Sequence, residues 1–301
     1  MHHDFNIWIT QMLAGDNRAL ARIISLVENN AEGYEQILQQ LKFSNKVKTI
    51  GITGSPGAGK STLINAMLTS LAIDSRVAVM AVDPTSPFNT GALLGDRVRM
   101  NEHYDNKNVY IRSLATRGNL GGLSAKTFEV ADVLSAAQFD YIIIETVGVG
   151  QSEVEIASLA DVTILVMVPE GGDDVQLLKS GIVEIADMFV INKSDRDGAD
   201  IMYKNIVTML HENGKDKTIP VQKTIASKNE GVIELLDNIK SLASHSSKEK
   251  KLHLAARRLF HIIQQQRMKN ISIENLTKQL ASHIDEEGFN IYKFGANENL
   301  F

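Results

Sequence analysis

The chain has 301 residues, of which 44% are hydrophobic and 22% are charged, and its formal net charge is -5 at pH 7. These values are ordinary for a globular protein, and the negative charge argues against a broad nucleic-acid-binding surface. Cysteine is absent, which excludes disulfide frameworks, thiolate zinc sites and cysteine nucleophiles and suits a cytoplasmic protein.

Two features of the chain bear on membranes and export. The longest apolar runs, such as residues 162–168, have the length of a strand and are too short to span a bilayer. The N-terminus lacks the basic start and the long apolar core of a signal peptide. We therefore expect a cytoplasmic protein that binds neither nucleic acid nor a membrane.

Residues 5–42 have the apolar spacing of helices. Asp16 or Asn17 is a suitable N-cap for one of them. The helix that follows carries an apolar stripe, the pattern of a helix that buries one face; the stripe consists of Leu20, Ile23, Ile24 and Val27. We expect residues 1–46 to form a helical extension in front of the main domain.

From Val47 onward the pattern changes to short apolar runs that are typical of buried strands. Helical stretches fall between these runs, and this alternation predicts an α/β fold with a mostly parallel sheet flanked by helices. We assign residues 47–243 to this main domain. The expected strands are 47–53, 77–82, 108–112, 141–145, 161–168, 187–192 and 219–224. The expected helices are 60–72, 124–138, 152–159, 175–186, 199–212 and 231–243.

The connection after the first expected strand matches the phosphate-binding pattern G-x-x-x-x-G-K-[ST]. Its residues are Gly54, Ser55, Pro56, Gly57, Ala58, Gly59, Lys60 and Ser61, and Thr62 follows them. The glycines let backbone N–H groups turn towards a phosphate, and the helix N-terminus adds partial positive charge. In this motif the lysine reaches the β- and γ-phosphates, and the serine hydroxyl binds Mg²⁺. The segment therefore predicts a P-loop NTPase.

Two carboxylates lie between the P-loop and the next motif. Asp83 ends the strand at 77–82, and the carboxyl ends of parallel strands form the ligand-binding edge of such sheets. Asp96 follows a glycine in the same connection. Either residue can coordinate Mg²⁺ or orient the attacking water. Alternatively, Asp83 starts a turn before a proline and Asp96 caps a helix, and the spacing leaves both interpretations open.

A third carboxylate, Glu145, ends an apolar run and is followed by the glycine-rich segment 146–153. A carboxylate at the end of a neighbouring strand is the Walker-B element, which holds Mg²⁺ directly or through water. The backbone N–H of Gly148 can approach the γ-phosphate, so we expect 146–153 to be a nucleotide-dependent switch. Gln151 is a candidate for positioning the attacking water. The expected catalytic set is Lys60, Asp96, Glu145 and Gln151.

A guanine-binding pattern, N-K-x-D, follows another apolar strand at Asn192, Lys193 and Asp195. Guanine presents an N1–H and a 2-amino group on one edge, and a single carboxylate accepts both. Adenine lacks these donors and would leave Asp195 unpaired. The Lys193 stem can lie over the base, Asn192 can tie loops together, and Ser227 with Lys228 resembles the turn that contacts the guanine carbonyl oxygen. The motif predicts GTP and GDP as ligands.

The C-terminal part of the chain begins with the polar, charged stretch 244–251, which we interpret as a boundary. Helical spacing returns over 252–268 and over a shorter stretch at about 273–284. This tail is too small to hold a core of its own, so it must pack on the main domain or on another chain. We assign residues 244–301 to a C-terminal helical arm.

Four segments together closely resemble the MeaB/ArgK family of methylmalonyl-CoA mutase-associated GTPases. They are GSPGAGKST at 54–62, VDPTSPFNTGALLGDRVRM at 82–100, ETVGVGQSEVE at 145–155 and GIVEIADMFVINKSD at 181–195. GDNRALARIISLVENN near the N-terminus looks like the leading helix of that family, and the resemblance runs from about residue 12 to residue 268. The family belongs to a GTPase class, shared with metallochaperones for nickel enzymes, that uses glutamate where Glu145 stands.

This resemblance implies a homodimeric G protein that partners an adenosylcobalamin-dependent acyl-CoA mutase such as methylmalonyl-CoA mutase. Family members gate delivery of the cofactor, protect the mutase from inactivation and help to remove damaged cofactor. The C-terminal helices are similar to the dimerisation arm of the family. The resemblance also implies switch loops at 83–100, 145–153 and 169–176, and an Mg²⁺ site formed by Ser61, Asp83, Asp96 and Glu145.

Two other functions remain open at this point. A metallochaperone-type GTPase for another metalloenzyme needs exposed histidine or cysteine ligands near the switches, but cysteine is absent and the eight histidines are scattered. A P-loop kinase would transfer the γ-phosphate to a small acceptor and would gain nothing from the N-K-x-D motif. Equal displacement of GTP by ATP would favour the kinase.

Overall fold

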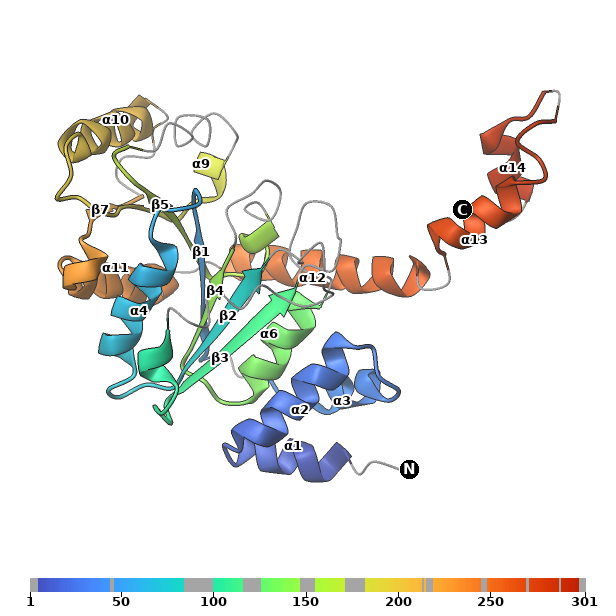
Figure 1. The fold of residues 1–301 in the computed structure, drawn as a ribbon, viewed down its shortest axis with the longest axis horizontal. Helices are drawn as coiled ribbons and strands as arrows, with labels where there is room; N and C mark the ends of the chain where they lie inside the picture. The colour runs from blue at the N-terminus through green and yellow to red at the C-terminus, as the bar shows by residue number, and fades with distance from the viewer. Residues whose placement is uncertain are drawn as a thin grey trace. The chain divides into compact units, whose positions relative to one another are not determined.

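The computed structural model describes residues 5–43, 46–83, 100–115, 126–146, 155–170, 182–212, 214, 219–244, 248–268, 271–286 and 288–297. These residues include a seven-stranded sheet in which every neighbouring pair of strands runs parallel (Figure 1). Each strand coincides with one of the predicted apolar runs, so the predicted α/β class is confirmed. The strands are β1 Lys48–Thr53, β2 Val77–Asp83, β3 Val109–Ala115, β4 Tyr141–Glu145, β5 Val162–Met167, β6 Met188–Ile191 and β7 Val221–Lys223.

The order of the strands in space differs from their order in the chain. It is β3-β2-β4-β1-β5-β6-β7, so β1 lies between β4 and β5. The register places Ile52 beside Glu145 and Thr53 beside Leu165. Because the strands are parallel, their carboxyl ends share one edge of the sheet, where open α/β sheets bind ligands. The P-loop after β1 and the carboxylate at the end of β4 therefore emerge side by side.

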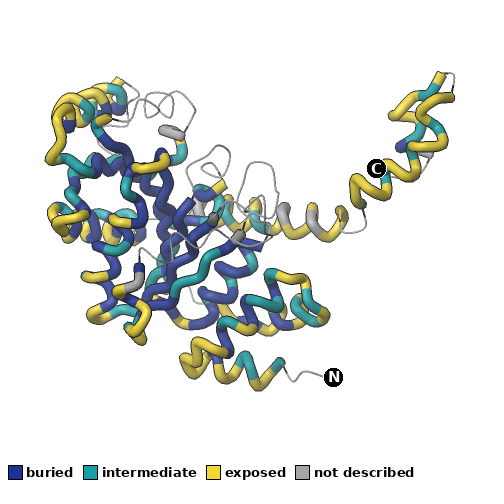
Figure 2. The backbone as a smooth tube through the Cα atoms, in the orientation of Figure 1, coloured by how far each residue is buried: buried dark blue, intermediate teal, exposed yellow. Residues whose placement is uncertain are grey.

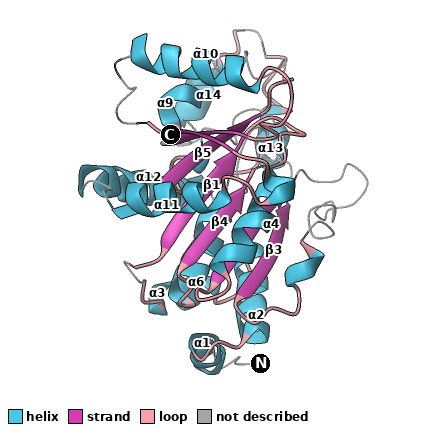
Figure 3. Ribbon diagram, turned by 90° about the vertical axis from the view of Figure 1, so that its left-hand side faces the viewer, coloured by secondary structure: helices cyan, strands magenta, loops and turns pink. Residues whose placement is uncertain are grey.

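Helices cover both faces of the sheet (Figure 3). One face packs against α4 (Lys60–Leu71) and α11 (Val232–Ser244). The other face packs against the N-terminal helices and α6 (Thr127–Ala136). Successive side chains of a strand point to opposite faces, so Val79 joins the first core and Met80 joins the second. Figure 2 shows that the strands are mostly buried, as expected for a parallel sheet covered on both sides.

A smaller core lies around β5 to β7 and includes Phe189, which is fully buried. Its helical cover is α10 (Ala199–Glu212), which agrees with the helix predicted at 199–212. Of the helix predicted at 175–186, the described part is α9 (Ile182–Ile185). Of the helix predicted at 152–159, the described part begins at residue 155. The described residues also include two short 3₁₀ segments, η1 (Asn101–His103) and η2 (Ala226–Lys228).

The N-terminal segment forms three helices, α1 (Phe5–Leu13), α2 (Asn17–Glu28) and α3 (Tyr34–Gln40). Asp16 is the N-cap of α2, and its carboxylate accepts hydrogen bonds from the backbone N–H groups of Arg18 and Ala19. The predicted stripe of α2 is buried in the core shared with α6 and the sheet, and its members are Leu20, Ile23, Ile24 and Val27. This extension is therefore packed onto the main domain through an amphipathic helix.

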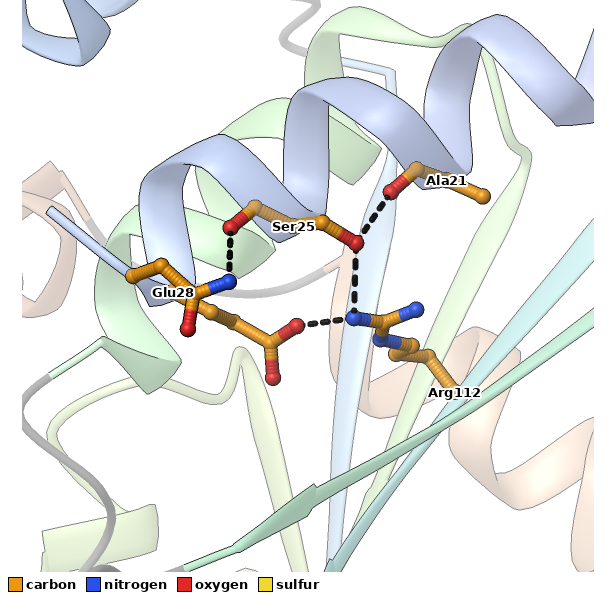
Figure 4. Close-up of polar contacts among 5 residues, drawn as sticks. Ala21, Ser25, Glu28 and Arg112 are labelled. Atoms are coloured by element: carbon orange, nitrogen blue, oxygen red, sulfur yellow. Dashed lines mark hydrogen bonds and ion pairs between the residues drawn. The ribbon is translucent and has the colours of Figure 1, made fainter. Parts of the chain in front are cut away.

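A polar network also attaches α2 to the edge strand β3 (Figure 4). Arg112 of β3 forms an ion pair with Glu28, and its Nη2 donates to Ser25 Oγ at 3.2 Å. Ser25 Oγ in turn donates to the backbone carbonyl of Ala21 at 2.9 Å. The Arg112 and Glu28 side chains are 21% and 14% exposed, so this ion pair is substantially shielded from solvent.

The C-terminal part contains α12 (Lys248–Met268), α13 (Ile273–Leu280) and α14 (Ile291–Asn297). Helix α12 begins inside the stretch that we interpreted as a boundary, because its first residues, Lys, Glu, Lys and Lys, are good helix formers. Helix α13 ends earlier than predicted, and α14 was not predicted. Asn290, whose side chain accepts from the backbone N–H groups of Tyr292 and Lys293, is the capping signal that marks α14.

The chain divides into two compact units, residues 1–251 and residues 252–301. The boundaries that we predicted after residues 46 and 243 stay predictions, since the first unit also contains the N-terminal helices. Within the described residues, none of the helices combines the length and the apolar character needed to cross a membrane.

Candidate nucleotide-binding site

The loop between β1 and α4 depends on glycine at defined positions. Gly54, Gly57 and Gly59 have φ angles of 141°, 79° and 85°, a region that other residues rarely adopt. A Cβ on Gly54 would lie 2.0 Å from the carbonyl oxygen of Val166, and one on Gly59 would lie 2.5 Å from Asn192 Nδ2. A Cβ on Gly57 would meet nothing within 4 Å, so the loop is open at that position.

Lys60 is the first residue of α4 and is 7% exposed. Its ammonium group donates to the backbone carbonyls of Gly54 at 2.7 Å and Ser55 at 3.1 Å. The lysine is thus folded back across the loop, next to the N-terminus of a twelve-residue helix. A helix N-terminus and a nearby ammonium group both favour a phosphate.

Ser61 and Glu145 meet at the carboxyl edge of the sheet. Ser61 Oγ donates to Glu145 Oε1 at 2.8 Å, and the two residues are 4% and 5% exposed. Magnesium prefers oxygen ligands and is usually held by one or two protein groups together with phosphate oxygens and water. A buried hydroxyl and carboxylate next to a phosphate-binding loop fit that requirement.

The other predicted Mg²⁺ and catalytic positions are described only in part. Asp83 is the last residue of β2, and β2 pairs with β4 in a register that places Ala81 beside Glu145. The backbone of Asp83 therefore ends at the same edge of the sheet. Asp96, Gly148 and Gln151 lie outside the described residues, and their roles stay predictions.

Asn192 joins three segments of the chain. Its Nδ2 donates to the P-loop carbonyl of Ala58 at 3.0 Å, and its Oδ1 accepts from Ala226 N at 3.1 Å and from Thr224 Oγ1 at 3.2 Å. Asn192 is 2% exposed, so the polar atoms of its side chain depend on these hydrogen bonds. The N-K-x-D motif predicts the asparagine, but no sequence pattern singled out Thr224 as its support.

Lys193 takes an unusual backbone conformation with φ at 55°. Its ammonium group donates to the carbonyl of Gly57 at 2.8 Å, so the side chain extends from the N-K-x-D loop to the P-loop. A left-handed conformation costs free energy in a residue with a side chain. The tertiary contact between the two loops offsets that cost and places the aliphatic stem of Lys193 between them.

Asp195 and Lys228 form an ion pair at 3.2 Å, and their side chains are 41% and 56% exposed. The hydrogen bond from Lys228 lowers the pKa of the Asp195 carboxyl below its ordinary value, and nearby positive charge adds to this effect. Asp195 is therefore kept as a carboxylate, the form that accepts two hydrogen bonds from guanine. Ser227 lies exposed beside Lys228 in η2, so the two predicted base-binding segments are neighbours.

Among the residues that the structure describes, no group of three or more histidine, cysteine, aspartate or glutamate side chains is arranged to hold a metal ion.

The sequence of this chain is similar to one family model and to several known proteins. The family model described as "Methylmalonyl Co-A mutase-associated GTPase MeaB" matches residues 20–284. A protein of Pyrococcus abyssi named as a GTPase is 48% identical over 239 residues, which are 77% of this chain and 74% of the relative. GTPase ArgK of Escherichia coli is 40% identical over 195 residues, which are 63% of this chain and 59% of the relative. The Mus musculus protein named "Methylmalonic aciduria type A homolog, mitochondrial" is 36% identical over 255 residues, which are 77% of this chain and 61% of the relative.

Solved structures share the fold. The structure described as LAO/AO transport system kinase has a TM-score of 0.68 and 22% identity, covering 99% of this chain and 97% of its own. HypB from Helicobacter pylori in complex with nickel has a TM-score of 0.50 and 16% identity, covering 76% of this chain and 98% of its own. At these identities the similarity concerns the arrangement of strands and helices, and it agrees with the parallel sheet described above.

Proposed function

This chain belongs to the family of methylmalonyl-CoA mutase-associated GTPases, and from that premise we propose that it is a chaperone of an adenosylcobalamin-dependent acyl-CoA mutase. The chain is a GTPase of the MeaB/ArgK type, since its relatives are named GTPases and its fold is that of P-loop GTPases. In the proposed function, the nucleotide state governs when the mutase receives its cofactor and whether it is protected or reactivated. The family match over residues 20–284 is the observation that carries this proposal.

The P-loop provides the phosphate-binding part of the proposed mechanism. Lys60 leaves the carbonyls of Gly54 and Ser55 and donates to the β- and γ-phosphates, where it stabilises the charge that develops as water attacks. The backbone N–H groups of the glycine-rich loop and the N-terminus of α4 bind the remaining phosphate oxygens. Asp96 and Gln151 are the candidates for orienting the attacking water.

The Mg²⁺ site would be formed by Ser61 and Glu145, together with Asp83 and Asp96. A bound Mg²⁺ neutralises charge on the β- and γ-phosphates. The contact between Ser61 and Glu145 supports this assignment because it holds two oxygen ligands together at the phosphate loop.

Guanine recognition would involve the N-K-x-D segment. Asp195 accepts from N1–H and from the 2-amino group, the stem of Lys193 lies over the ring, and Ser227 and Lys228 lie next to the carbonyl oxygen. Asn192 holds this segment against the P-loop through Ala58. We expect GDP to bind far more tightly than ADP, because adenine has neither the N1–H nor the 2-amino group that guanine would donate to the Asp195 carboxylate.

Homodimer formation through the C-terminal arm is also part of the proposal. Helix α12 carries an apolar stripe at helical spacing, with Leu252 70%, Leu259 58% and Ile263 41% exposed. Such a stripe on one chain suggests an apolar partner surface. Replacing Leu259 and Phe260 by serine should convert the dimer to monomer in analytical ultracentrifugation, whereas Ile201→Ser on α10 should not; a dimer that survives the double change would contradict the arm assignment.

The proposed mutase partner is tested by measuring whether purified mutases bind to this protein. The full-length protein, loaded with a non-hydrolysable GTP analogue, with GDP or with no nucleotide, is mixed with purified adenosylcobalamin-dependent acyl-CoA mutases. We expect nucleotide-dependent binding and a change in the rate of GTP hydrolysis when the correct mutase is present. Hydrolysis that no such mutase alters, together with no binding in any nucleotide state, would count against the chaperone role while leaving the GTPase activity untouched.

The metallochaperone and the kinase are the alternatives. The chain has no cysteine, so a metallochaperone would have to hold its cargo with histidine or carboxylate ligands alone. A kinase would need no guanine specificity, whereas Asn192 links the N-K-x-D segment to the P-loop. Competition between GTP and ATP separates the kinase from the GTPase, and retention of Ni²⁺ or Zn²⁺ by the purified protein tests the metallochaperone.

A further inference from the structure

Two buried hydroxyl groups lie between the carboxyl ends of β1 and β4. Thr146 Oγ1 donates to Thr53 Oγ1 at 3.0 Å, and the two residues are 1% and 0% exposed. Neither residue belongs to the eight-residue P-loop pattern, and neither is a predicted ligand of nucleotide or metal. Burial of a hydroxyl is unfavourable unless it forms a hydrogen bond, so this contact compensates for the burial of both groups.

The two threonines stand next to the residues that form the site. Thr53 ends β1 and directly precedes Gly54, where the P-loop begins, whereas Thr146 directly follows Glu145. The backbone N–H of Thr146 also donates to the carbonyl of Ile52 at 3.1 Å, which continues the pairing of β1 and β4 past the last residue of β4. The hydroxyl contact is therefore a lateral link between the P-loop and the segment that carries Glu145.

A hydrogen bond supplies something that apolar packing would not. Valine has nearly the same shape as threonine and is common in buried strands, so space filling at these positions does not require hydroxyl groups. A hydrogen bond has a preferred length and direction, whereas the hydrophobic effect is non-directional. The hydroxyl pair therefore restrains how far the two strand ends can separate or slide.

We propose that the Thr53–Thr146 hydroxyl pair is a positioning element of the nucleotide site. It keeps Glu145 at a fixed distance from Ser61, so that the two oxygen ligands, 2.8 Å apart, are arranged before Mg²⁺–nucleotide binds. Octahedral Mg²⁺ tolerates little error in ligand position, which makes such a restraint useful. The threonines act through Glu145 and the P-loop backbone. This inference rests on the proposed Mg²⁺ and nucleotide site.

The test compares valine and serine at the two positions. Thr53→Val and Thr146→Val each remove one hydroxyl, whereas Thr53→Ser and Thr146→Ser retain it. Calorimetry measures the affinity for GDP with and without Mg²⁺. We expect each valine variant to reduce the Mg²⁺-dependent gain in affinity about tenfold, the effect of one lost hydrogen bond. Affinity without Mg²⁺ should be unchanged because Lys60 and the loop backbone remain, and the serine variants should behave as wild type.

A control variant and a double variant separate positioning from general destabilisation. Thr163→Val changes another buried threonine, on β5, which is 1% exposed, and should leave the Mg²⁺ dependence unchanged whatever it does to thermal stability. The Mg²⁺-dependent gain in GDP affinity should be no smaller in the Thr53→Val/Thr146→Val variant than in either single variant, because all three variants lose the same hydrogen bond.

Several results would overturn the proposal. One is a folded valine variant whose GDP affinity depends on Mg²⁺ as that of wild type does. Another is a double variant in which the losses of the two single variants add fully. The third is a serine variant that loses as much of the Mg²⁺-dependent gain in affinity as the valine variant does. Substitution at two positions keeps the test decisive if one variant fails to fold. A wild-type protein that ignores GDP in the presence of Mg²⁺ would overturn the proposed nucleotide site itself, which is a different outcome.

Discussion

The hydroxyl of Ser61 and the carboxylate of Glu145 are in contact at 2.8 Å although the two residues are 84 positions apart in the chain. Ser61 is in the first turn of α4 and Glu145 ends β4, and they meet because β4 lies beside β1. Both residues are buried, so the surrounding protein restricts the conformations that their side chains can adopt. The contact defines the centre of the predicted Mg²⁺ site, and the first prediction concerns it.

Replacing Glu145 with glutamine should weaken Mg²⁺-dependent nucleotide binding. Glutamine keeps the shape and can still accept from Ser61, but it carries no charge to attract the cation. We expect the gain in GDP affinity produced by Mg²⁺ to fall about 10- to 100-fold, measured by calorimetry. Glu234→Gln, an exposed position on α11, is the control. Equal Mg²⁺ dependence in wild type and Glu145→Gln would show that the carboxylate is not part of the site.

Replacing Lys60 with methionine should affect nucleotides according to their number of phosphates. Methionine retains the aliphatic stem but cannot donate to the β- and γ-phosphates, a charge-assisted contact. Affinity for GTP and GDP should fall about 100-fold, whereas the weaker affinity for GMP should be nearly unchanged. Equilibrium binding of fluorescent GTP, GDP and GMP analogues measures this difference. An equal loss of affinity for all three nucleotides would indicate that the substitution damages the P-loop, and not that it removes a phosphate contact.

The ion pair between Asp195 and Lys228 predicts a pH effect. Lys228 lowers the pKa of Asp195, so the carboxylate stays charged further into the acid range. The free energy that this ion pair contributes is present above the ordinary pKa of aspartate and is lost as pH falls through the lowered value. Lys228→Ala should therefore raise the pKa of Asp195. As the pH is lowered, the variant should begin to lose GDP affinity at a higher pH than wild type does.

Carbon-detected NMR of the Asp195 carboxyl group measures that titration directly. Lys240→Ala is a matched control, because Lys240 forms a similarly exposed ion pair with Asp237 on α11. The control should titrate as wild type does. An unchanged Asp195 titration in Lys228→Ala would mean that another group is responsible for the lowered pKa.

The link between Glu28 and Arg112 predicts a stability effect remote from the nucleotide. Glu28→Gln would leave the partly buried guanidinium of Arg112 without its counter-charge. We expect a loss of about 1–3 kcal/mol in the free energy of unfolding by urea, with unchanged GDP affinity. Glu32→Gln, at an exposed position, should change stability by less than about 0.5 kcal/mol. If Glu28→Gln were as stable as wild type, the ion pair between Glu28 and Arg112 would not contribute to the stability of the fold.

The sequence by itself determined the features that contiguous residues create. The P-loop needs eight consecutive residues, strand character follows from apolar runs, and the stripe of α2 follows from helical spacing, so each was predicted correctly. The prediction was poorer in the C-terminal part, where α12 begins earlier than expected, α13 ends earlier and α14 was not predicted. The first four residues of α12 are polar and its apolar spacing begins only at Leu252, so the pattern does not show where the helix starts.

The tertiary structure alone decided which of these features come together. Seven apolar strands look alike in sequence, and periodicity does not reveal that β1 lies between β4 and β5. That order brings Ser61 to Glu145, Thr53 to Thr146 and Asn192 to Ala58. Strand order follows from how whole helices pack on both faces of the sheet, a property of the complete chain. Local residue patterns predicted the chemistry of each motif, and packing across the sheet assembled these motifs into one site.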